Sequence, residues 1–473
     1  MGIFGRDTTR ALSTRAIALL QAGKFAEALP LCQELVALTP ESAVVWSNLG
    51  WALMQNHRLD EAVAACETAL MLNPNNRWAW GNKGVALSRL GRHDEALSAY
   101  DRACELDPAG LLHGRTTPYR NRLWPLLQLR RFDEVIAVAD TLLRYLPNDV
   151  EIWVKRGQAL AGLRRHAEAE ETLLFASELK SPEAALSQLA ILYAGKMRAY
   201  DKALNVVDRL FAYRPNDVSS WSLRGYVLSA SGAYEEALSA FERAMACGGL
   251  SDTTLGGLWN SRGDALMRLG RFQDALIALD KGAGLAPGNA YLFITRGEVY
   301  SHIERESGAL ACYEAAHMAQ PTVLLAQTNI AAALVALGSL DEAKPHLDAV
   351  LAVNAEHGCA WYVIGMRETA LGQFEDALAA LDTSITLEPT HAAHYAAFAE
   401  LLLKLDDPEH ACRVIERALA FDPIDARSWR IKAQALHAAG KLEEAAEAER
   451  RGAELLAEQT AQVDAYLQAQ GGS

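Results

Sequence analysis

The sequence predicts an all-α fold, a solenoid of stacked helix–turn–helix units that ends in a capping helix. Three observations predict it. Prolines recur 34 residues apart, most are followed six residues later by an aromatic residue, and a glycine and an alanine follow the aromatic by four and sixteen residues. One helical pair of this size cannot bury its apolar face alone, so consecutive units must stack on one another.

The repeat can be followed position by position along the chain. The 34-residue spacing joins Pro40, Pro74 and Pro108, then Pro287 and Pro321, then Pro389 and Pro423. The aromatic position holds Trp46, Trp80, Trp153, Trp221, Trp259, Phe293, Trp361, Tyr395 and Trp429. The glycine position holds Gly50, Gly84, Gly157, Gly225, Gly263, Gly297 and Gly365. The alanine position holds Ala62, Ala96, Ala169, Ala237, Ala275, Ala309, Ala377, Ala411 and Ala445. Proline ends the second helix of a unit, and the small residues let its two helices pack closely.

Each unit has the apolar pattern of two short helices. Residues 43–76 show it as two apolar runs at helical spacing, separated by a turn at 55–58. Insertions near 110–115 and 248–253 add five and four residues. The sixth copy lacks the aromatic and the glycine and is out of phase near 196–200. At the end, Leu456, Val463 and Leu467 form one apolar stripe, which predicts a capping helix over the last repeat.

These offsets resemble the tetratricopeptide repeat, a helix–turn–helix unit of 34 residues. The resemblance covers residues 9–459 as about thirteen tandem repeats, with an N-terminal extension at 1–8 and the end of the capping helix and a tail at 460–473. It implies a right-handed superhelical solenoid in which the first helix of each repeat, helix A, lines a concave groove. Grooves of this family bind extended peptides or protein segments, so we expect a protein-interaction scaffold.

Composition excludes several other classes of protein. The formal net charge of −14 argues against general nucleic-acid binding. Seven cysteines without a CxxC pair argue against a disulfide framework or a zinc ribbon. No apolar stretch approaches the roughly 18 residues of a membrane span, and the N-terminus has no secretory signal pattern. We therefore expect a cytoplasmic protein without membrane insertion.

The sequence contains no catalytic motif. It has no P-loop, no HExxH and no GxSxG, so we expect no enzyme activity and no cofactor. His391 and His394 are spaced to share one side of a helix. Without acidic or thiolate residues nearby, these two histidines predict no metal site.

Asparagines recur at one position of the second, third and fourth repeats. With the aromatic numbered as position 4, position 6 holds Asn48, Asn82 and Asn121. Evenly spaced amides can pair with the N–H and C=O groups of a peptide backbone. The run resembles the asparagine ladder in the tetratricopeptide superhelix of O-linked N-acetylglucosamine transferase. Alternatively, asparagine belongs to the consensus of the repeat and needs no ligand.

The three tryptophans outside the aromatic position fall in the same repeats. They are Trp51, Trp78 and Trp124. Tryptophan is enriched among binding hot spots, so they predict anchors for a ligand. The alternative is that they fill packing gaps between adjacent A helices.

Charge is distributed unevenly along the chain. Residues 110–165 carry a net charge of +5, and Arg89, Arg120 and Lys155 occupy groove positions there or nearby, which would suit an acidic or carboxylate-bearing ligand. Residues 341–473 carry −12, which offers either a second, acidic surface or a solvated convex face. Pro125 falls inside helix A of the fourth repeat and should kink it. Three interpretations of this kink are open: a hinge, a feature that shapes the ligand site, or neutral variation.

Three functions follow as hypotheses. The first is a non-catalytic scaffold that binds an extended, possibly acidic protein segment in the groove of repeats two to four. Its contacts would come from Asn48, Trp51, Trp78, Asn82, Arg89, Arg120, Asn121, Trp124 and Lys155. The second is a substrate-recognition or regulatory subunit of a separate enzyme. The third is a self-assembling structural protein, against which the capping helix argues.

Overall fold

The computed structural model describes residues 3–471, and every regular element in that range is a helix. The predicted all-α solenoid is thereby confirmed. The sequence pattern predicts one continuous array, but the chain forms two compact units, residues 1–213 (unit 1) and 214–473 (unit 2). Over 3–471 no helix combines the length and the apolar character needed to cross a membrane.

Unit 1 consists of short helices joined by tight turns. In chain order they are α1 (Ile3–Gln21), α2 (Phe25–Leu38), α3 (Ala43–Gln55), α4 (Leu59–Leu72), α5 (Arg77–Arg89), α6 (His93–Glu105), α7 (Thr117–Asn121), α8 (Leu123–Gln128), α9 (Phe132–Leu143), α10 (Val150–Gly162), α11 (His166–Ser177), α12 (Glu183–Ile191), the π-helix η1 (Leu192–Met197) and α13 (Tyr200–Tyr213). Each helix A packs against the helix B that follows it. In two repeats helix A has two segments, α7 with α8 and α12 with η1.

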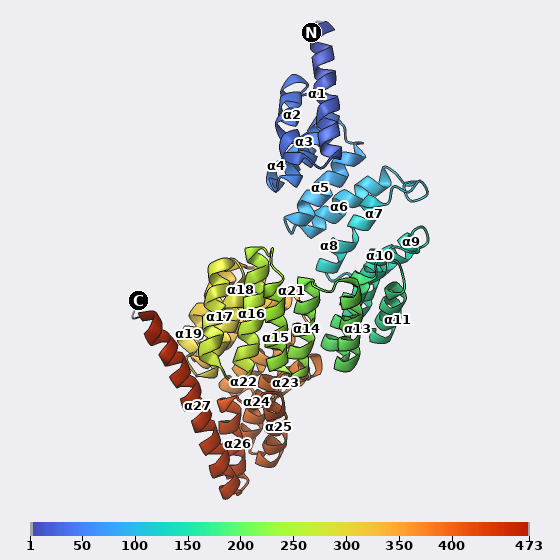
Figure 1. Ribbon diagram of the computed structural model, residues 1–473. Coiled ribbons are helices and arrows are strands. Elements are labelled where there is room, and N and C mark those ends of the chain that lie inside the picture. Colours follow the sequence, from blue (N-terminus) through green and yellow to red (C-terminus); the bar gives the residue numbers. More distant parts are fainter. Residues whose placement is uncertain (1–2, 472–473) are drawn as a thin grey trace. The chain divides into compact units, whose positions relative to one another are not determined.

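Unit 2 continues the same pairing with more regular helices (Figure 1). They are α14 (Val218–Ser231), α15 (Tyr234–Ala246), α16 (Asp252–Arg268), α17 (Phe272–Leu285), α18 (Ala290–His302), α19 (Glu306–Ala319), α20 (Leu324–Ala336), α21 (Leu340–Val353), α22 (Gly358–Leu371), α23 (Phe374–Leu387), α24 (Ala392–Lys404), α25 (Pro408–Phe421), α26 (Ala426–Ala438) and α27 (Leu442–Gly471).

The small residues of the repeat lie where helices A and B touch. A Cβ atom on Gly84 would come within 2.6 Å of the Tyr100 ring, and one on Gly50 within 2.6 Å of the Cys66 sulfur. Ala96, at the alanine position, has no exposed surface. Larger side chains at these positions would force the helices of a pair apart, and the close-packed interior tolerates such changes poorly.

The aromatic position has a hydrogen-bonding role that explains its distance from the proline. The indole N–H donates to the backbone carbonyl six residues upstream, at the turn between repeats. This bond joins Trp46 to Pro40, Trp80 to Pro74, Trp153 to Pro147, Trp361 to Ala355 and Trp429 to Pro423, at 2.7–2.9 Å. The Tyr395 hydroxyl donates to the Pro389 carbonyl at 2.8 Å in the same way. The aromatic thus satisfies a backbone carbonyl of the turn between two repeats, which lies outside both helices and has no helical partner.

The fourth repeat departs from the regular pair as its sequence predicts. Helix A is broken, since α7 ends at Asn121 and α8, with Pro125 in its first turn, begins two residues later. The inserted segment before it is held by Arg115, which donates two hydrogen bonds of 2.6 Å to the Asp107 carboxylate. The same guanidinium lowers the pKa of Asp107 to about 2. Tyr119 donates to the Asp107 carbonyl at 3.0 Å.

The sixth repeat absorbs its change of phase in a π-helix. After α12 the chain continues as η1 and ends in Arg198, whose φ of 54° lies in the left-handed region. A π turn accommodates an additional residue without ending the helix. The expected irregularity near 196–200 is therefore a local widening of helix A.

The C-terminal helix covers a surface far upstream in the sequence. α27 packs on α26, as expected for a cap, but its C-terminal part also packs on α17. Val463 and Tyr466 are buried in one cluster with Phe272. The Gln462 side chain accepts from the Phe272 N–H at 2.7 Å and donates to the Gly270 carbonyl at 3.0 Å. The prediction of a capping helix over the last repeat is therefore confirmed, and the same helix extends beyond that repeat onto α17.

Candidate functional site

The nine predicted contact residues lie in unit 1 on the A helices of consecutive pairs. This set, termed the A-helix surface, comprises Asn48 and Trp51 on α3, Trp78, Asn82 and Arg89 on α5, Arg120 and Asn121 on α7, Trp124 on α8, and Lys155 on α10. Neighbouring A helices touch directly, α3 with α5 and α8 with α10. Between these two pairs of A helices, α5 and the α7–α8 helix both pack on α6, and none of the nine side chains is fully buried.

The asparagines are partly engaged within the protein. The Asn82 amide donates to the Ser47 carbonyl of the preceding A helix at 3.2 Å, which leaves its side-chain carbonyl as an acceptor. Asn121 is the last residue of α7, where helix A breaks. Asn82 therefore has a structural bond that needs no ligand, and the break after Asn121 interrupts the regular spacing that a ladder requires.

The three tryptophans have different surroundings. Trp51 packs against the core of unit 1, with its ring centroid 6.0 Å from that of Phe25, which agrees with the gap-filling alternative. Trp78 and Trp124 remain 65% and 49% exposed. The Arg77 guanidinium lies 4.8 Å from the Trp78 ring centroid. These two exposed indoles are the largest apolar groups that the A-helix surface offers to a partner.

The three predicted cations also differ. Arg89 donates to the Met54 carbonyl at 3.2 Å. Arg120 pairs with Glu151 at 2.6 Å and lies 3.5 Å from Asp149. Lys155 lies over the Trp124 ring, 5.0 Å from its centroid, and burial lowers the pKa of its ammonium group.

Other basic groups of segment 110–165 are paired with carboxylates of the same unit. The pairs are Arg115 with Asp107, Arg122 with Asp101, Arg131 with Glu134, Arg156 with Asp140 and Arg165 with Glu168. An anionic ligand would have to compete with these internal partners. Within residues 9–471, no ion pair joins Lys155 to a carboxylate, so this lysine is available to an anionic ligand. The nearby Glu151 carboxylate, which opposes the lowering of the Lys155 pKa by burial, is paired with Arg120.

Sequence reasoning missed a second group of candidate functional side chains, which carry metal-binding atoms and lie in unit 2. The expectation that His391 and His394 have no acidic or thiolate residue nearby is wrong. Cys359 and Glu388 lie beside them, and one donor atom from each of the four residues lies within 4.8 Å of the others. The sequence contained a signal for this group, because Glu388 stands three residues before His391 and Cys359 stands at the start of the preceding helix A. Burial lowers the pKa of His394 to about 3, so its imidazole is neutral at pH 7.

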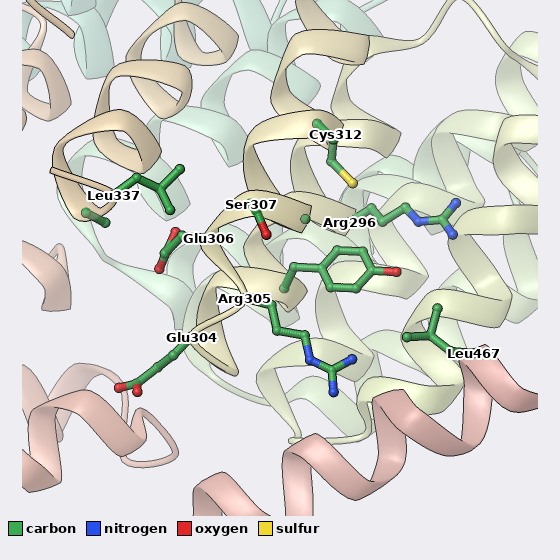
Figure 2. A pocket seen from close by; sticks show the side chains of 12 residues that line it. Arg296, Glu304, Arg305, Glu306, Ser307, Cys312, Leu337 and Leu467 are labelled. Carbon is green, nitrogen blue, oxygen red and sulfur yellow. The ribbon is translucent and has the colours of Figure 1, made fainter. Parts of the chain in front are cut away.

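Unit 2 also contains an open pocket of about 820 Å³ between α18, α19, α20 and α27. Figure 2 shows Arg305 and Leu467 among the side chains that line it. Arg305 pairs with Asp464 of α27 at 2.5 Å, and Arg296 donates to the Tyr466 hydroxyl of α27 at 2.9 Å. The charged groups of the pocket thus hold α27 in place, which makes the pocket a seam between helices.

Comparison with known families agrees with this architecture. Models of the tetratricopeptide repeat match residues 13–77, 47–110, 125–177, 189–250, 328–392 and 368–435, together more than half of the chain. The chain therefore belongs to the tetratricopeptide repeat family. Membership of this family, whose proteins bind other proteins, supports a role as a protein-interaction scaffold.

Individual relatives are distant. Anaphase-promoting complex subunit 3 of Schizosaccharomyces pombe is 23% identical over 168 residues, which are 36% of this chain and 25% of that protein. The match thus spans about a quarter of the curated relative. The crystal structure of the APC/C hetero-tetramer Cut9–Hcn1 is similar at a TM-score of 0.43 and 14% identity, covering 89% of this chain and 88% of that chain. A likeness at that level carries no functional argument.

Proposed function

We propose that the chain is a non-catalytic scaffold that binds an extended peptide or protein segment on the A-helix surface of unit 1. The observation that carries this proposal is the exposure of Trp78 and Trp124, at 65% and 49%, on A helices of successive repeats. Exposed tryptophans are costly to leave in water and are enriched at the centres of protein interfaces. They would anchor apolar side chains of the ligand.

The polar groups between the anchors suit a peptide backbone. The Asn82 side-chain carbonyl remains an acceptor after its amide has donated to Ser47, and Asn48 and Asn121 stand on the A helices of the preceding and following repeats. Side-chain amides can pair with both the N–H and the C=O groups of an extended chain. Such contacts would give affinity with little dependence on the ligand sequence.

Lys155 adds a preference for acidic ligands. Its ammonium group sits over the ring of Trp124, so a carboxylate placed there would meet a cation beside an apolar surface. Charge-assisted hydrogen bonds are stronger than neutral ones. The favoured ligand is an extended segment that carries an acidic residue next to a large apolar side chain.

A second candidate function is that of a subunit in a larger assembly, supplying recognition to a separate enzyme. It is favoured by the name of the curated relative, which is a subunit of the anaphase-promoting complex. Purification from native cells separates the two candidates. A stable stoichiometric complex with a co-purifying enzyme activity would support the second, and a transient complex through unit 1 would support the first.

The main proposal is tested by crosslinking mass spectrometry on the protein in its native cells, followed by affinity measurements with the purified partner segment. Trp78→Ala and Trp124→Ala in the full chain should each weaken binding by about 2 kcal/mol, roughly 30-fold, as expected of interface hot spots. Met71→Ala is the matched control, because Met71 is 84% exposed on the neighbouring helix B, α4. Unchanged affinity in both tryptophan variants would place the binding site elsewhere.

A further inference from the structure

Four side chains with metal-binding atoms meet at the junction of α22, α23 and α24. They are the Cys359 thiol, the Glu388 carboxylate and the imidazoles of His391 and His394, and one donor atom from each lies within 4.8 Å of the other three. All four belong to unit 2. The cluster is therefore independent of the A-helix surface in unit 1 and of the proposed function.

The turn between two repeats assembles this cluster. Glu388 directly follows α23, His391 directly precedes α24, and His394 lies in the first turn of α24. Cys359 is the second residue of α22, the preceding helix A. Gly358 makes room for the carboxylate, since a Cβ atom there would come within 2.8 Å of the Glu388 carboxyl carbon. Three donors thus come from seven consecutive residues, and the fourth is brought in by stacking of the repeats.

His394 gives an independent indication that a partner belongs here. Its side chain has no exposed surface, and neither ring nitrogen has a hydrogen-bond partner of standard geometry within the described residues. The Ser384 backbone lies near the ring and favours its protonated form, but it does not complete such a bond. Buried polar atoms are nearly always paired, and an unpaired buried imidazole nitrogen next to a thiol and a carboxylate has the surroundings of a metal ligand.

The neighbouring groups are arranged around His394. Its ring stacks between Tyr362, at a centroid distance of 5.0 Å, and His391, at 4.4 Å. The Cys359 thiol donates to the Glu388 carboxylate at 3.2 Å. The tyrosine ring packs on His394, whereas His391 is exposed and would have to turn its stacked ring toward a shared ion.

We propose that Cys359, Glu388, His391 and His394 form a structural zinc site. Zinc is bound tetrahedrally by thiolate, imidazole and carboxylate donors, and four protein ligands make a closed, structural site. The mixture of one sulfur, two nitrogens and one oxygen donor favours Zn²⁺ over Mg²⁺ or Ca²⁺, which prefer oxygen ligands only. On binding, the Cys359 proton is released to solvent and the thiolate replaces its hydrogen bond to Glu388 with a bond to the metal.

Such an ion would join two successive repeats. Cys359 belongs to the pair α22–α23, and the two histidines belong to the pair α24–α25. A zinc bridge would resist separation of these pairs and so stabilise the folded form. Because a site of this kind does not exist in the unfolded chain, its binding free energy adds to the free energy of unfolding.

The test uses the full chain, reduced and freed of metal with a chelator, and Zn²⁺ or Co²⁺ alone as the probe. Competition against a chromophoric chelator should show one tightly bound Zn²⁺ per chain. Co²⁺ should give thiolate-to-metal charge-transfer absorption and the strong visible bands of a tetrahedral site. Zn²⁺ should also raise the unfolding temperature. Absence of tight one-to-one binding in the wild-type chain would overturn the proposal.

Variants then assign the ligands. Cys359→Ser should abolish the charge-transfer absorption, and Cys359→Ser and His394→Gln should each weaken Zn²⁺ binding by more than about 100-fold, beyond the loss typical of outer-shell changes. Cys412→Ser and His437→Gln are the matched controls in the same unit and should bind like the wild type. Retention of the charge-transfer absorption in Cys359→Ser, or its loss in Cys412→Ser, would refute the assignment.

One further variant guards against misfolding. His391 is exposed, so His391→Gln should leave the circular dichroism spectrum and the metal-free unfolding temperature unchanged. It should nevertheless lose the rise in unfolding temperature that Zn²⁺ gives the wild-type chain. A full Zn²⁺-dependent rise in His391→Gln would show that this histidine is not a ligand and would overturn the four-residue site.

Discussion

Asn82 and Arg89 show how single residues join one repeat to the next. Asn82 donates to the Ser47 carbonyl, and Arg89 donates to the Met54 carbonyl, in each case 35 residues upstream. The separation is one residue more than the repeat, so each side chain reaches the residue just before its own counterpart in the preceding A helix. A sequence pattern reveals that such residues face the neighbouring helix. It does not reveal whether their polar groups are already bonded there, because this depends on rotamers and on distances of less than an ångström.

Glu298 on α18 leads to a prediction about pH. Burial raises the pKa of its carboxyl from 4.5 to about 7, with Arg268 opposing the shift and Asp264 adding to it. Between those two pH values the folded chain binds a proton that the unfolded chain has lost, so the Glu298 contribution to the free energy of unfolding falls as pH rises. Glu298→Gln removes this titration and should stabilise unit 2 by about 2 kcal/mol at pH 8.

The measurement is a series of urea unfolding curves between pH 5 and pH 8, for wild type and variant. The difference in free energy of unfolding between the two should grow as pH rises. Glu409→Gln is the control, because Glu409 is exposed, and its difference from wild type should stay constant. A constant difference for Glu298→Gln as well would show that Glu298 does not titrate in this range.

At the scale of helices, periodic features were predictable and single events were not. Because most repeats contain the glycine, alanine and aromatic contacts, their positions predicted the A–B pairs. Pro125 predicted the break between α7 and α8, and the phase change near 196–200 marked η1. The return of α27 onto α17 occurs once, across about 190 residues, so no repeat in the sequence signals it. The meeting of Cys359 with His394 depends likewise on stacking between repeats.

The packing of α27 on α17 predicts which residues of its apolar stripe matter. Val463 has no exposed surface, whereas Leu467, four residues on, is 37% exposed. Val463→Ala should therefore lower the free energy of unfolding of unit 2 by about 2 kcal/mol, from lost apolar burial and the cavity left behind. Leu467→Ala on the same helix should cost less than about 0.5 kcal/mol. Urea denaturation followed by circular dichroism measures both, and equal costs would mean that the C-terminal part of α27 does not pack as described.

At the scale of the whole molecule, the division into two compact units predicts separable stability. Each unit has its own buried clusters: Leu87, without exposed surface, lies in one of unit 1, and Val463 lies in one of unit 2. Stability in repeat proteins is approximately a sum of repeat and nearest-neighbour terms. A core change in one unit should therefore lower the local stability of that unit alone.

Leu87→Ala, which should cost unit 1 about 3 kcal/mol, and Val463→Ala form a matched pair for this test. Hydrogen exchange followed by mass spectrometry should show faster exchange in helices α3 to α6 for Leu87→Ala and in α16, α17 and α27 for Val463→Ala. The double variant should show the sum of the two effects, because the two residues lie in different buried clusters and share no packing partner. Faster exchange in both units from either single variant would mean that the chain unfolds as one cooperative body.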